Sequence, residues 1–338
     1  MSEQNPEAAP VEPAALPYKD RSFGLSIFGL LTILLGCLTG LLVVLMLAGV
    51  LAAARNTRGP HVNLSAFLPA MLVYGILAVA LIWLGIGSVM ARRWARALLL
   101  IFSWSWLALG GFMMIVMAFM IPKMLAAISH AGATGRQPHP PPPPPMGMVM
   151  LVIFLVFGFL FVLLPAVWTF FYNSRHVTAT CETRYPLACW TDACPLPVLG
   201  LCLWLLFSVP WMLFMPITGH GVIPFFGMFL SGFPGALIYL AIAALWSYAA
   251  WLLYQMNPIG WWLILFALVL FIVSSMLTYE LQDAAEMYQR MGYPLEQIRA
   301  MQRLGLLAGN RMNWISLFSM LPFLGYLLYI KKYLPDKS

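Results

Sequence analysis

Residues 23–54 read FGLSIFGLLTILLGCLTGLLVVLMLAGVLAAA, a run that contains no charged side chain. It exceeds the roughly 20 apolar residues that a helix needs to cross about 30 Å of hydrocarbon, where every backbone amide must be satisfied within its own segment. The rest of the chain has the same character, since 62% of its 338 residues are hydrophobic and only 9% are charged. This composition predicts a membrane protein and excludes soluble globular, disordered and disulfide-rich secreted chains.

Eight segments of the chain are apolar and long enough to span a membrane. They run from Phe23 to Ala54, Ser65 to Met90, Ala97 to Ile121, Met146 to Tyr172, Leu196 to Pro216, Pro234 to Gln255, Pro258 to Tyr279 and Trp314 to Ile330. All 18 basic and 11 acidic side chains fall outside these spans. A charge at the centre of a membrane helix costs roughly 2.5–3.5 kcal/mol, so this pattern argues against a proton relay, an ion site or a voltage sensor in the bilayer. We predict an all-α, polytopic helical membrane protein with about eight transmembrane helices.

The segments between the spans complete the predicted organisation. In order, the parts are a disordered N-terminal tail at 1–22, a first four-helix unit at 23–172 with a Pro-rich loop at 122–145, a Cys-containing linker at 173–195, and a second four-helix unit at 196–338 with amphipathic helices within 280–311. Glu286 and Arg290 have the spacing of an i,i+4 ion pair on the first amphipathic helix. The uncharged stretch 217–233 contains several Gly and Pro residues, and we expect an interfacial or re-entrant piece there.

Basic residues near the span ends indicate the orientation, because cytoplasmic loops carry more Lys and Arg. The short loop at 91–96 contains three Arg residues, and the last span ends in Lys331 and Lys332. We therefore expect both termini to be cytoplasmic in a multi-pass protein of the bacterial plasma (inner) membrane. The net charge of +7 does not indicate nucleic-acid binding, because the basic residues are scattered between apolar runs instead of gathering on a soluble face.

An internal duplication is suggested by two pairs of tryptophans. Trp83 and Trp94 flank one tight turn, and Trp251 and Trp262 flank another with the same spacing, displaced by half the chain. This pattern favours two tandem four-helix halves in the same orientation. The alternative is coincidence, because Trp is a common interfacial anchor in membrane proteins.

The linker contains the side chains that are best suited to bind a metal or to form a disulfide, His176, Cys181, Cys189 and Cys194. A tetrahedral zinc site is one interpretation, although structural zinc sites usually bring their ligands in closer pairs than these. A disulfide between Cys181 and Cys194 is a second, and it requires an oxidising compartment and therefore the opposite orientation. Reduced, structural thiols in a short cytoplasmic linker are the interpretation we favour, with no metal and no cofactor.

Of all the acidic residues in the chain, two in the linker come closest to a pair of carboxylates that could act in acid–base catalysis. Glu182 and Asp192 flank Arg184, and we expect this polar cluster to organise the linker, with Asp192 or Thr191 capping the fifth span. The chain contains none of the GxGxxG, P-loop, HExxH or GxSxG motifs. We therefore predict no catalytic residues and no enzymatic activity.

Two strings in the linker carry a family resemblance: Thr180-Cys181-Glu182, and the run WTDACPLPVL at 190–199. They resemble the signature of a family of uncharacterised bacterial polytopic integral membrane proteins. The resemblance covers about twenty residues and implies membrane location, but no activity. It also implies that Cys181 and Cys194 are the recurring pair and that Cys189 is a departure.

The sequence leaves two main functions open, and a third, an enzyme that acts on lipid at the membrane interface, would require His176, Glu182, Arg184 and Asp192 to converge on one cleft. The first, which we favour, is a non-enzymatic integral membrane protein of structural, accessory or regulatory type. The second is a transporter or permease for a neutral or lipid-like solute, with its path between the two halves and helix-breaking Gly and Pro residues beside it. Either function is compatible with a homo-oligomer or with a membrane protein partner.

Overall fold

The computed structural model of the protein describes residues 19–55, 64–134, 146–303, 307 and 309–335. Within these residues, seven helical segments are long and apolar enough to cross a membrane. They are α1 (Ser22–Arg55), α2 (Leu64–Val89), α3 (Arg93–Thr134), the continuous run of α4 (Met146–Gly158), η1 (Phe159–Leu163) and α5 (Leu164–Tyr172), α7 (Leu196–Thr218), α8 (Phe233–Tyr254) and α9 (Pro258–Leu281). The prediction of an all-α, polytopic helical membrane protein is confirmed. Large apolar side chains along these helices are exposed, as in a protein that contacts lipid.

The predicted eighth span corresponds to α12 (Gly309–Lys331), but its apolar part is shorter than the other seven and covers Ser316–Lys331. The helix begins with polar residues, including Asn313, that shorten the hydrophobic stretch. A second difference concerns the predicted Pro-rich loop at 122–145. Helix α3 continues through its first part to Thr134, because Lys123 ends the apolar run without ending the helix. The rest of that loop and residues 1–18 of the predicted tail lie outside the described residues.

The chain forms two compact units, which are described separately below. Unit 1 comprises residues 1–35 and 81–187, and unit 2 comprises residues 36–80 and 188–338, so that α1 and α2 are each divided between the units. The boundary at 187 and 188 lies within the predicted linker. The tandem duplication stays a prediction.

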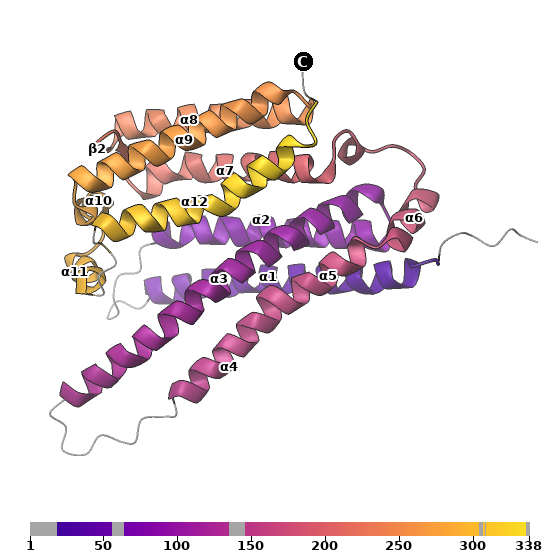
Figure 1. Ribbon diagram of the computed structural model, residues 1–338. Helices are drawn as coiled ribbons and strands as arrows, with labels where there is room; N and C mark the ends of the chain where they lie inside the picture. The colour runs from indigo at the N-terminus through magenta and orange to yellow at the C-terminus, as the bar shows by residue number, and fades with distance from the viewer. Residues whose placement is uncertain (1–18, 56–63, 135–145, 304–306, 308, 336–338) are drawn as a thin grey trace, which may run out of the picture. The chain divides into compact units, whose positions relative to one another are not determined.

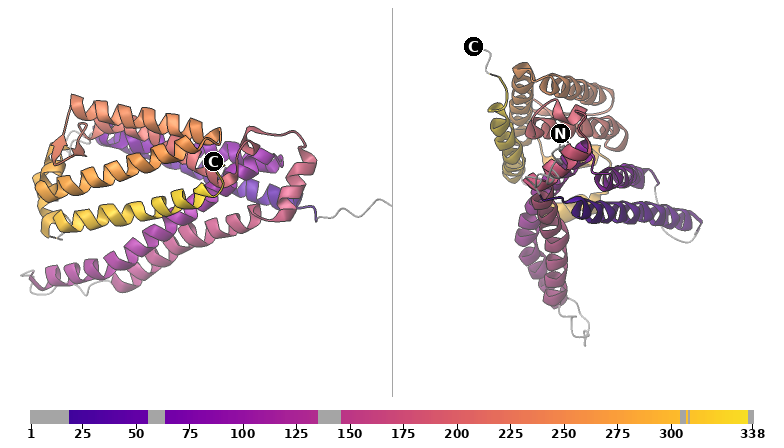
Figure 2. Two further views of the ribbon diagram at one scale, coloured as in Figure 1. Left: turned by 45° about the horizontal axis from the view of Figure 1, so that its top comes forward. Right: turned by 90° about the vertical axis from the view of Figure 1, so that its right-hand side faces the viewer.

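In unit 1, α3 packs along α4, η1 and α5, and the two runs lie side by side in Figures 1 and 2. The fourth span contains a π-helical segment, in which Leu164 donates its backbone N–H to the Phe159 carbonyl. Pro165 follows and has no N–H to donate, so the preceding carbonyls lose a helical partner. The Phe161 carbonyl points at Gly110 of α3, where a Cβ atom would collide with it. Gly110 therefore allows the two backbones to approach closely.

The remaining contacts of unit 1 join its helices near one end. Gly29 of α1 and Gly85 of α2 face each other so closely that a Cβ on Gly85 would lie 2.7 Å from the Gly29 carbonyl oxygen. Ser88 donates to the Leu25 carbonyl at 3.1 Å, and its oxygen lies 2.7 Å from the Tyr172 hydroxyl. Because Ser88 has one hydrogen to give, Tyr172 is the donor in that second bond. Helices α1, α2 and α5 thus meet at a buried hydroxyl pair.

In unit 2, the helices pack in the sequence α7, α8, α9, α12, with successive members in contact (Figure 1). Trp261 of α9 is buried and donates its indole N–H to the Leu327 carbonyl of α12 at 2.7 Å. Tyr326 of α12 donates to the Pro197 carbonyl at the start of α7 at 2.8 Å. The last helix is therefore fastened to both the first and the third helix of this unit.

Between α7 and α8 the chain forms a β-hairpin of β1 (Ile223–Phe225) and β2 (Met228–Leu230). Two short helices, α10 (Ala284–Arg290) and α11 (Leu295–Arg303), follow α9. Figure 1 places the hairpin, α10 and α11 at the same end of unit 2, beside the end of α9.

Candidate functional site

The predicted linker becomes two short elements that belong to different units. Helix α6 (Arg175–Arg184) carries Cys181 and Glu182 and packs on α3 and α5 within unit 1. The 3-10 turn η2 (Trp190–Asp192) precedes α7 in unit 2. The signature residues are therefore used at two separate places in the fold.

The cysteines of the linker are mostly buried. Cys181 and Cys194 are buried and Cys189 is half-buried, and the structure contains no disulfide among the five cysteines, all of which it describes. Burial raises the pKa of the Cys181 thiol to about 11, although the nearby Arg96 guanidinium acts in the opposite direction. Burial also raises the pKa of Cys194. Thiols held in the neutral form in this way are poor nucleophiles and poor metal ligands.

The zinc interpretation gains no support from the described part of the chain, in which no group of three or more His, Cys, Asp or Glu side chains is arranged to hold a metal. His176 instead accepts the backbone N–H of Lys19 at Nδ1, at 3.3 Å. In the same way, Thr180 accepts the backbone N–H of Arg21 at 3.2 Å. Both side chains of α6 therefore hold the chain segment that leads into α1.

The three charged residues of the predicted polar cluster each have a different partner. Glu182 lies 3.9 Å from the Arg93 guanidinium, and Arg184 lies 3.8 Å from Asp20. The carboxylate of Asp20 also accepts the backbone N–H of Ser22, which together with Arg184 lowers the pKa of Asp20. These ion pairs, whose side chains are half-buried or exposed, tie α6 to the segment before α1 and to the first residue of α3, and each contributes little to stability by itself.

Asp192 does not have the role that the sequence predicts, which is to cap the fifth span. It accepts the backbone N–H of Cys189 at 3.0 Å and so caps the short turn η2. Helix α7 begins after Pro195 without a side-chain cap, so the prediction that Asp192 or Thr191 caps the fifth span is wrong. The proline-rich start of α7 explains this, because Pro at the first positions removes an N–H that a cap would otherwise satisfy.

A more promising arrangement lies at the other end of unit 2 and centres on the β-hairpin. The strands pair antiparallel with Ile223 opposite Leu230 and Phe225 opposite Met228, joined by a two-residue turn. Both turn residues, Phe226 and Gly227, have positive φ, of 40° and 94°. This is the geometry of a type I′ hairpin turn, which Phe adopts only with strain.

Two hydroxyls of α9 hold the tip of this hairpin. Ser274 accepts the Phe226 N–H at 2.9 Å and donates to the Pro224 carbonyl at 3.3 Å. Thr278, one helical turn further on, accepts the Gly227 N–H at 3.0 Å. Since Ser274 lies seven residues before the end of α9, the tip reaches about 10 Å along that helix at 1.5 Å per residue. The stretch 217–233 thus contains a hairpin that runs back along α9, and its interfacial or re-entrant placement stays a prediction.

The turn that enters the hairpin is shaped by backbone contacts. His220 and Gly221 both have positive φ, and the His220 carbonyl accepts the Gly232 N–H at 2.7 Å. The Gly221 carbonyl approaches Gly235, in the first turn of α8, so closely that a Cβ there would collide with it. The hairpin therefore starts and ends against the amino-terminal end of α8.

Arg290, at the end of α10, fastens the hairpin from the other side. Its Nη1 donates to the Phe229 carbonyl of β2 at 2.6 Å, and its Nε and Nη2 donate to Glu286 at 3.1 and 2.6 Å. The predicted i,i+4 pair between Glu286 and Arg290 is thereby confirmed, with the additional role of holding a strand. Gly292, at φ 83°, ends this helix segment, and the His220 imidazole lies over it.

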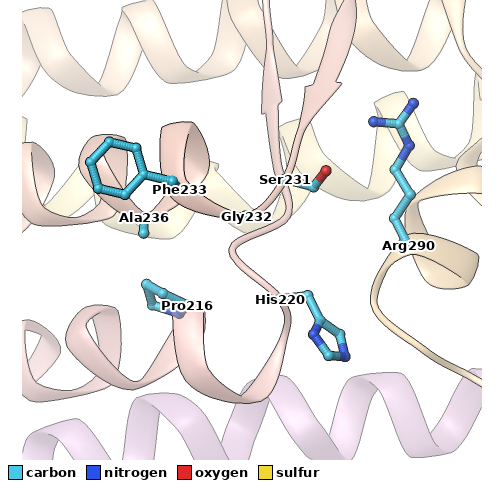
Figure 3. A pocket seen from close by; sticks show the side chains of 7 residues that line it. All are labelled: Pro216, His220, Ser231, Gly232, Phe233, Ala236 and Arg290. Carbon is cyan, nitrogen blue, oxygen red and sulfur yellow. The ribbon is translucent and has the colours of Figure 1, made fainter.

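A pocket of about 570 Å³ opens beside these residues. Its lining comes from the end of α7, the two ends of the hairpin, the start of α8 and the end of α10: Pro216, His220, Ser231, Gly232, Phe233, Ala236 and Arg290. Figure 3 shows the side chains of His220, Ser231 and Arg290 on one side and those of Pro216, Phe233 and Ala236 on the other. The pocket thus has a polar side and an apolar side.

Sequence reasoning placed the candidate site in the linker and missed this pocket. Its residues come from three separated segments, and no motif connects them. One signal was present, since Ser274, Ser275 and Thr278 are hydroxyl residues near the end of a mainly apolar span. Comparison of the chain with protein-family models, with curated proteins and with solved structures finds no match.

Proposed function

We propose that the protein is a non-enzymatic, multi-pass membrane protein of structural, accessory or regulatory type. The observation that carries this proposal is how the spans use their hydroxyl groups. Six hydroxyls donate to carbonyls of their own helices at 2.7–2.9 Å, namely those of Thr32, Ser103, Thr169, Ser208, Ser247 and Thr278. A hydroxyl used in this way gives no hydrogen to a passing polar solute, which disfavours a polar transport route along these helices.

The break in the fourth span supports the same proposal. Discontinuous helices in transporters direct freed backbone groups at a solute. Here the carbonyl of Phe161 is freed by Pro165 but faces Gly110 of α3, so helix packing covers it. The irregular segment thus tightens the bundle.

Transport of a neutral or lipid-like solute is the second candidate, and the hairpin favours it. Non-helical backbone at membrane depth is tolerated where protein buries it or where it lines a cavity. The hairpin tip is held by Ser274 and Thr278, while Phe225, Phe226 and Met228 of the same tip are exposed. A lipid-like solute passing at this end would meet these three apolar side chains.

Reconstituted vesicles separate the two candidates. The full-length protein is inserted into phosphatidylcholine vesicles, and osmotic swelling with glycerol and erythritol is measured together with dithionite quenching of a fluorescent lipid. We expect both rates to equal those of protein-free vesicles prepared in parallel. Swelling or lipid flipping that grows with the protein content would overturn the proposal. A change of that rate in the Thr278→Val variant would then place the route at the hairpin.

We also propose that the protein lies in the bacterial plasma membrane with both termini in the cytoplasm. Lys331 supports this orientation, because its ammonium group lies 5.2 and 5.5 Å from the ring centres of Trp261 and Trp262. Basic and aromatic side chains together are typical of the cytoplasmic membrane interface. The resemblance to the family with the TCE and WTDxCPLPVL signature remains part of this proposal. Its residues have a structural use here, since the carbonyls of Trp190 and Pro197 accept hydrogen bonds from Tyr254 and Tyr326.

A further inference from the structure

The pocket at the start of α8 contains N–H and O–H groups that could donate hydrogen bonds to a ligand. Arg290 has five N–H groups, of which one binds the Phe229 carbonyl and two bind Glu286. Two guanidinium N–H groups are therefore available to a ligand. His220 and Ser231 face the same side of the pocket (Figure 3), and no hydrogen bond of either side chain is found within the described part of the chain.

The three donors come from three separate segments of the chain and line the same side of one pocket. A guanidinium, an imidazole and a hydroxyl side by side suit an acceptor with several oxygens, as a phosphate has. Glu286 offsets part of the Arg290 charge, so the site depends on directed hydrogen bonds as well as on charge. The backbone N–H groups at the first turn of α8 add a favourable field for an anion.

The position of the pocket selects the kind of phosphate. Pro216 lies two residues before the end of α7, and Phe233 is the first residue of α8, so the pocket stands at the ends of two membrane spans. Span ends lie at the depth of the lipid headgroups. The apolar side of the pocket continues onto exposed side chains, with Phe233 at 77% and Ile217 at 75% exposure. A ligand with a phosphate and an acyl chain matches both sides.

We propose that this pocket binds a phospholipid through its phosphate group, with Arg290, His220 and Ser231 as donors and with Pro216, Phe233 and Ala236 against the glycerol and the first acyl carbons. This site is independent of the proposed function, since a structural protein or a transporter could equally carry it. It holds one lipid molecule in a defined orientation at the end of α7 and α8.

The test uses the full-length protein in a neutral maltoside detergent and native mass spectrometry to count bound ligands. Three probes separate the parts of the ligand: lauroyl-lysophosphatidate, glycerol 3-phosphate and monolauroylglycerol. We expect the lysophosphatidate to bind about tenfold or more tightly than either part alone, because only it uses both sides of the pocket. Equal binding of monolauroylglycerol would overturn recognition of the phosphate. Equal binding of glycerol 3-phosphate would overturn the lipid assignment.

Two variants locate the binding without removing the bonds that hold the hairpin. Ser231→Glu places a carboxylate in the pocket and is expected to weaken lysophosphatidate binding about tenfold or more. Glu286→Gln keeps an acceptor for Arg290 but removes the competing charge, so binding should become tighter, which a misfolded protein could not show. Arg299→Gln, on exposed α11, is the matched control and should change nothing. Unchanged binding in both pocket variants would overturn the proposal.

Discussion

Thr278 and Gly227 meet at 3.0 Å, where the hydroxyl of a membrane helix accepts the backbone N–H of a tight turn. Thr278 is completely buried and donates its own hydrogen to the Ser274 carbonyl at 2.7 Å. The turn amide therefore has a protein acceptor. Together with the bonds from Ser274 and Arg290, this contact holds the hairpin at the end of a helical bundle.

Replacing Thr278 by Val keeps the shape of the side chain and removes the acceptor. The part-buried Gly227 N–H then loses this acceptor, and we expect the free energy of unfolding to fall by about 1–3 kcal/mol. Titration of the purified protein with sodium dodecyl sulfate, followed by circular dichroism, measures the change. Thr218→Val is the control, because Thr218 is exposed and, among the residues that the structure describes, its hydroxyl bonds only the Phe214 carbonyl of its own helix. Equal midpoints for the two variants would contradict the role given to Thr278.

Gly235 is the point at which the hairpin touches α8, and an added methyl group tests it. A Cβ atom would collide with the Gly221 carbonyl, which belongs to the backbone and cannot rotate away. We expect Gly235→Ala to destabilise the protein by about 1–3 kcal/mol through overpacking. Gly49→Ala, where no atom lies within 4 Å of the new methyl group, should be neutral or slightly stabilising. Thermal unfolding in detergent compares the two, and a tolerant Gly235 would show that the turn can move.

Adjacent tryptophans at the start of α9 provide a second matched pair. Trp261 is 3% exposed and bonds the Leu327 carbonyl, whereas Trp262 is 58% exposed. We expect Trp261→Phe to lower the free energy of unfolding by about 1–2 kcal/mol through the lost hydrogen bond and the void. Trp262→Phe should stay within about 0.5 kcal/mol of the parent. A larger effect at Trp262 would contradict the packing of α12 on α9.

The thiol of Cys181 gives a prediction that depends on pH. Because its pKa is raised from 9.0 to about 11, the reactive thiolate is about 100-fold scarcer at neutral pH than for an ordinary cysteine. In single-cysteine variants, maleimide should label Cys189 faster than Cys181, and the Cys181 rate should rise tenfold per pH unit up to about pH 11. The unfolded chain loses this proton first, so folding stability should decline as pH rises above about 9. Equal labelling rates at pH 7 would show that Cys181 is accessible.

The same maleimide labelling tests on which side of the membrane the linker lies and whether its cysteines are reduced. If the linker is cytoplasmic, an impermeant maleimide should reach Cys189 only after the cells are permeabilised. Labelling of the wild-type protein in intact cells only after reduction would instead indicate an external disulfide and invert the proposed topology. The Cys181 and Cys194 pairing is the disulfide that this outcome would assign.

The spans were predictable because hydropathy acts on each segment separately, and the Glu286 and Arg290 pair was predictable because helical spacing alone brings the two together. The hairpin was not, since its strands are three residues long and its turn contains Phe226, a residue with no preference for positive φ. Its stability comes from Ser274 and Thr278, about fifty residues away in the chain. The pocket is lined by residues from three separated segments, including Arg290, and could not be inferred from local patterns.

The glycine notch at Gly110 also fixes how part of unit 1 can move. The Phe161 carbonyl oxygen lies where a Cβ atom on Gly110 would be, so it fits against α3 at a position without a side chain. To slide along the fourth span, α3 would first have to move away from the Phe161 carbonyl oxygen. The close approach at Gly110 therefore resists sliding of α3 along the fourth span, and we expect the two helices to move together.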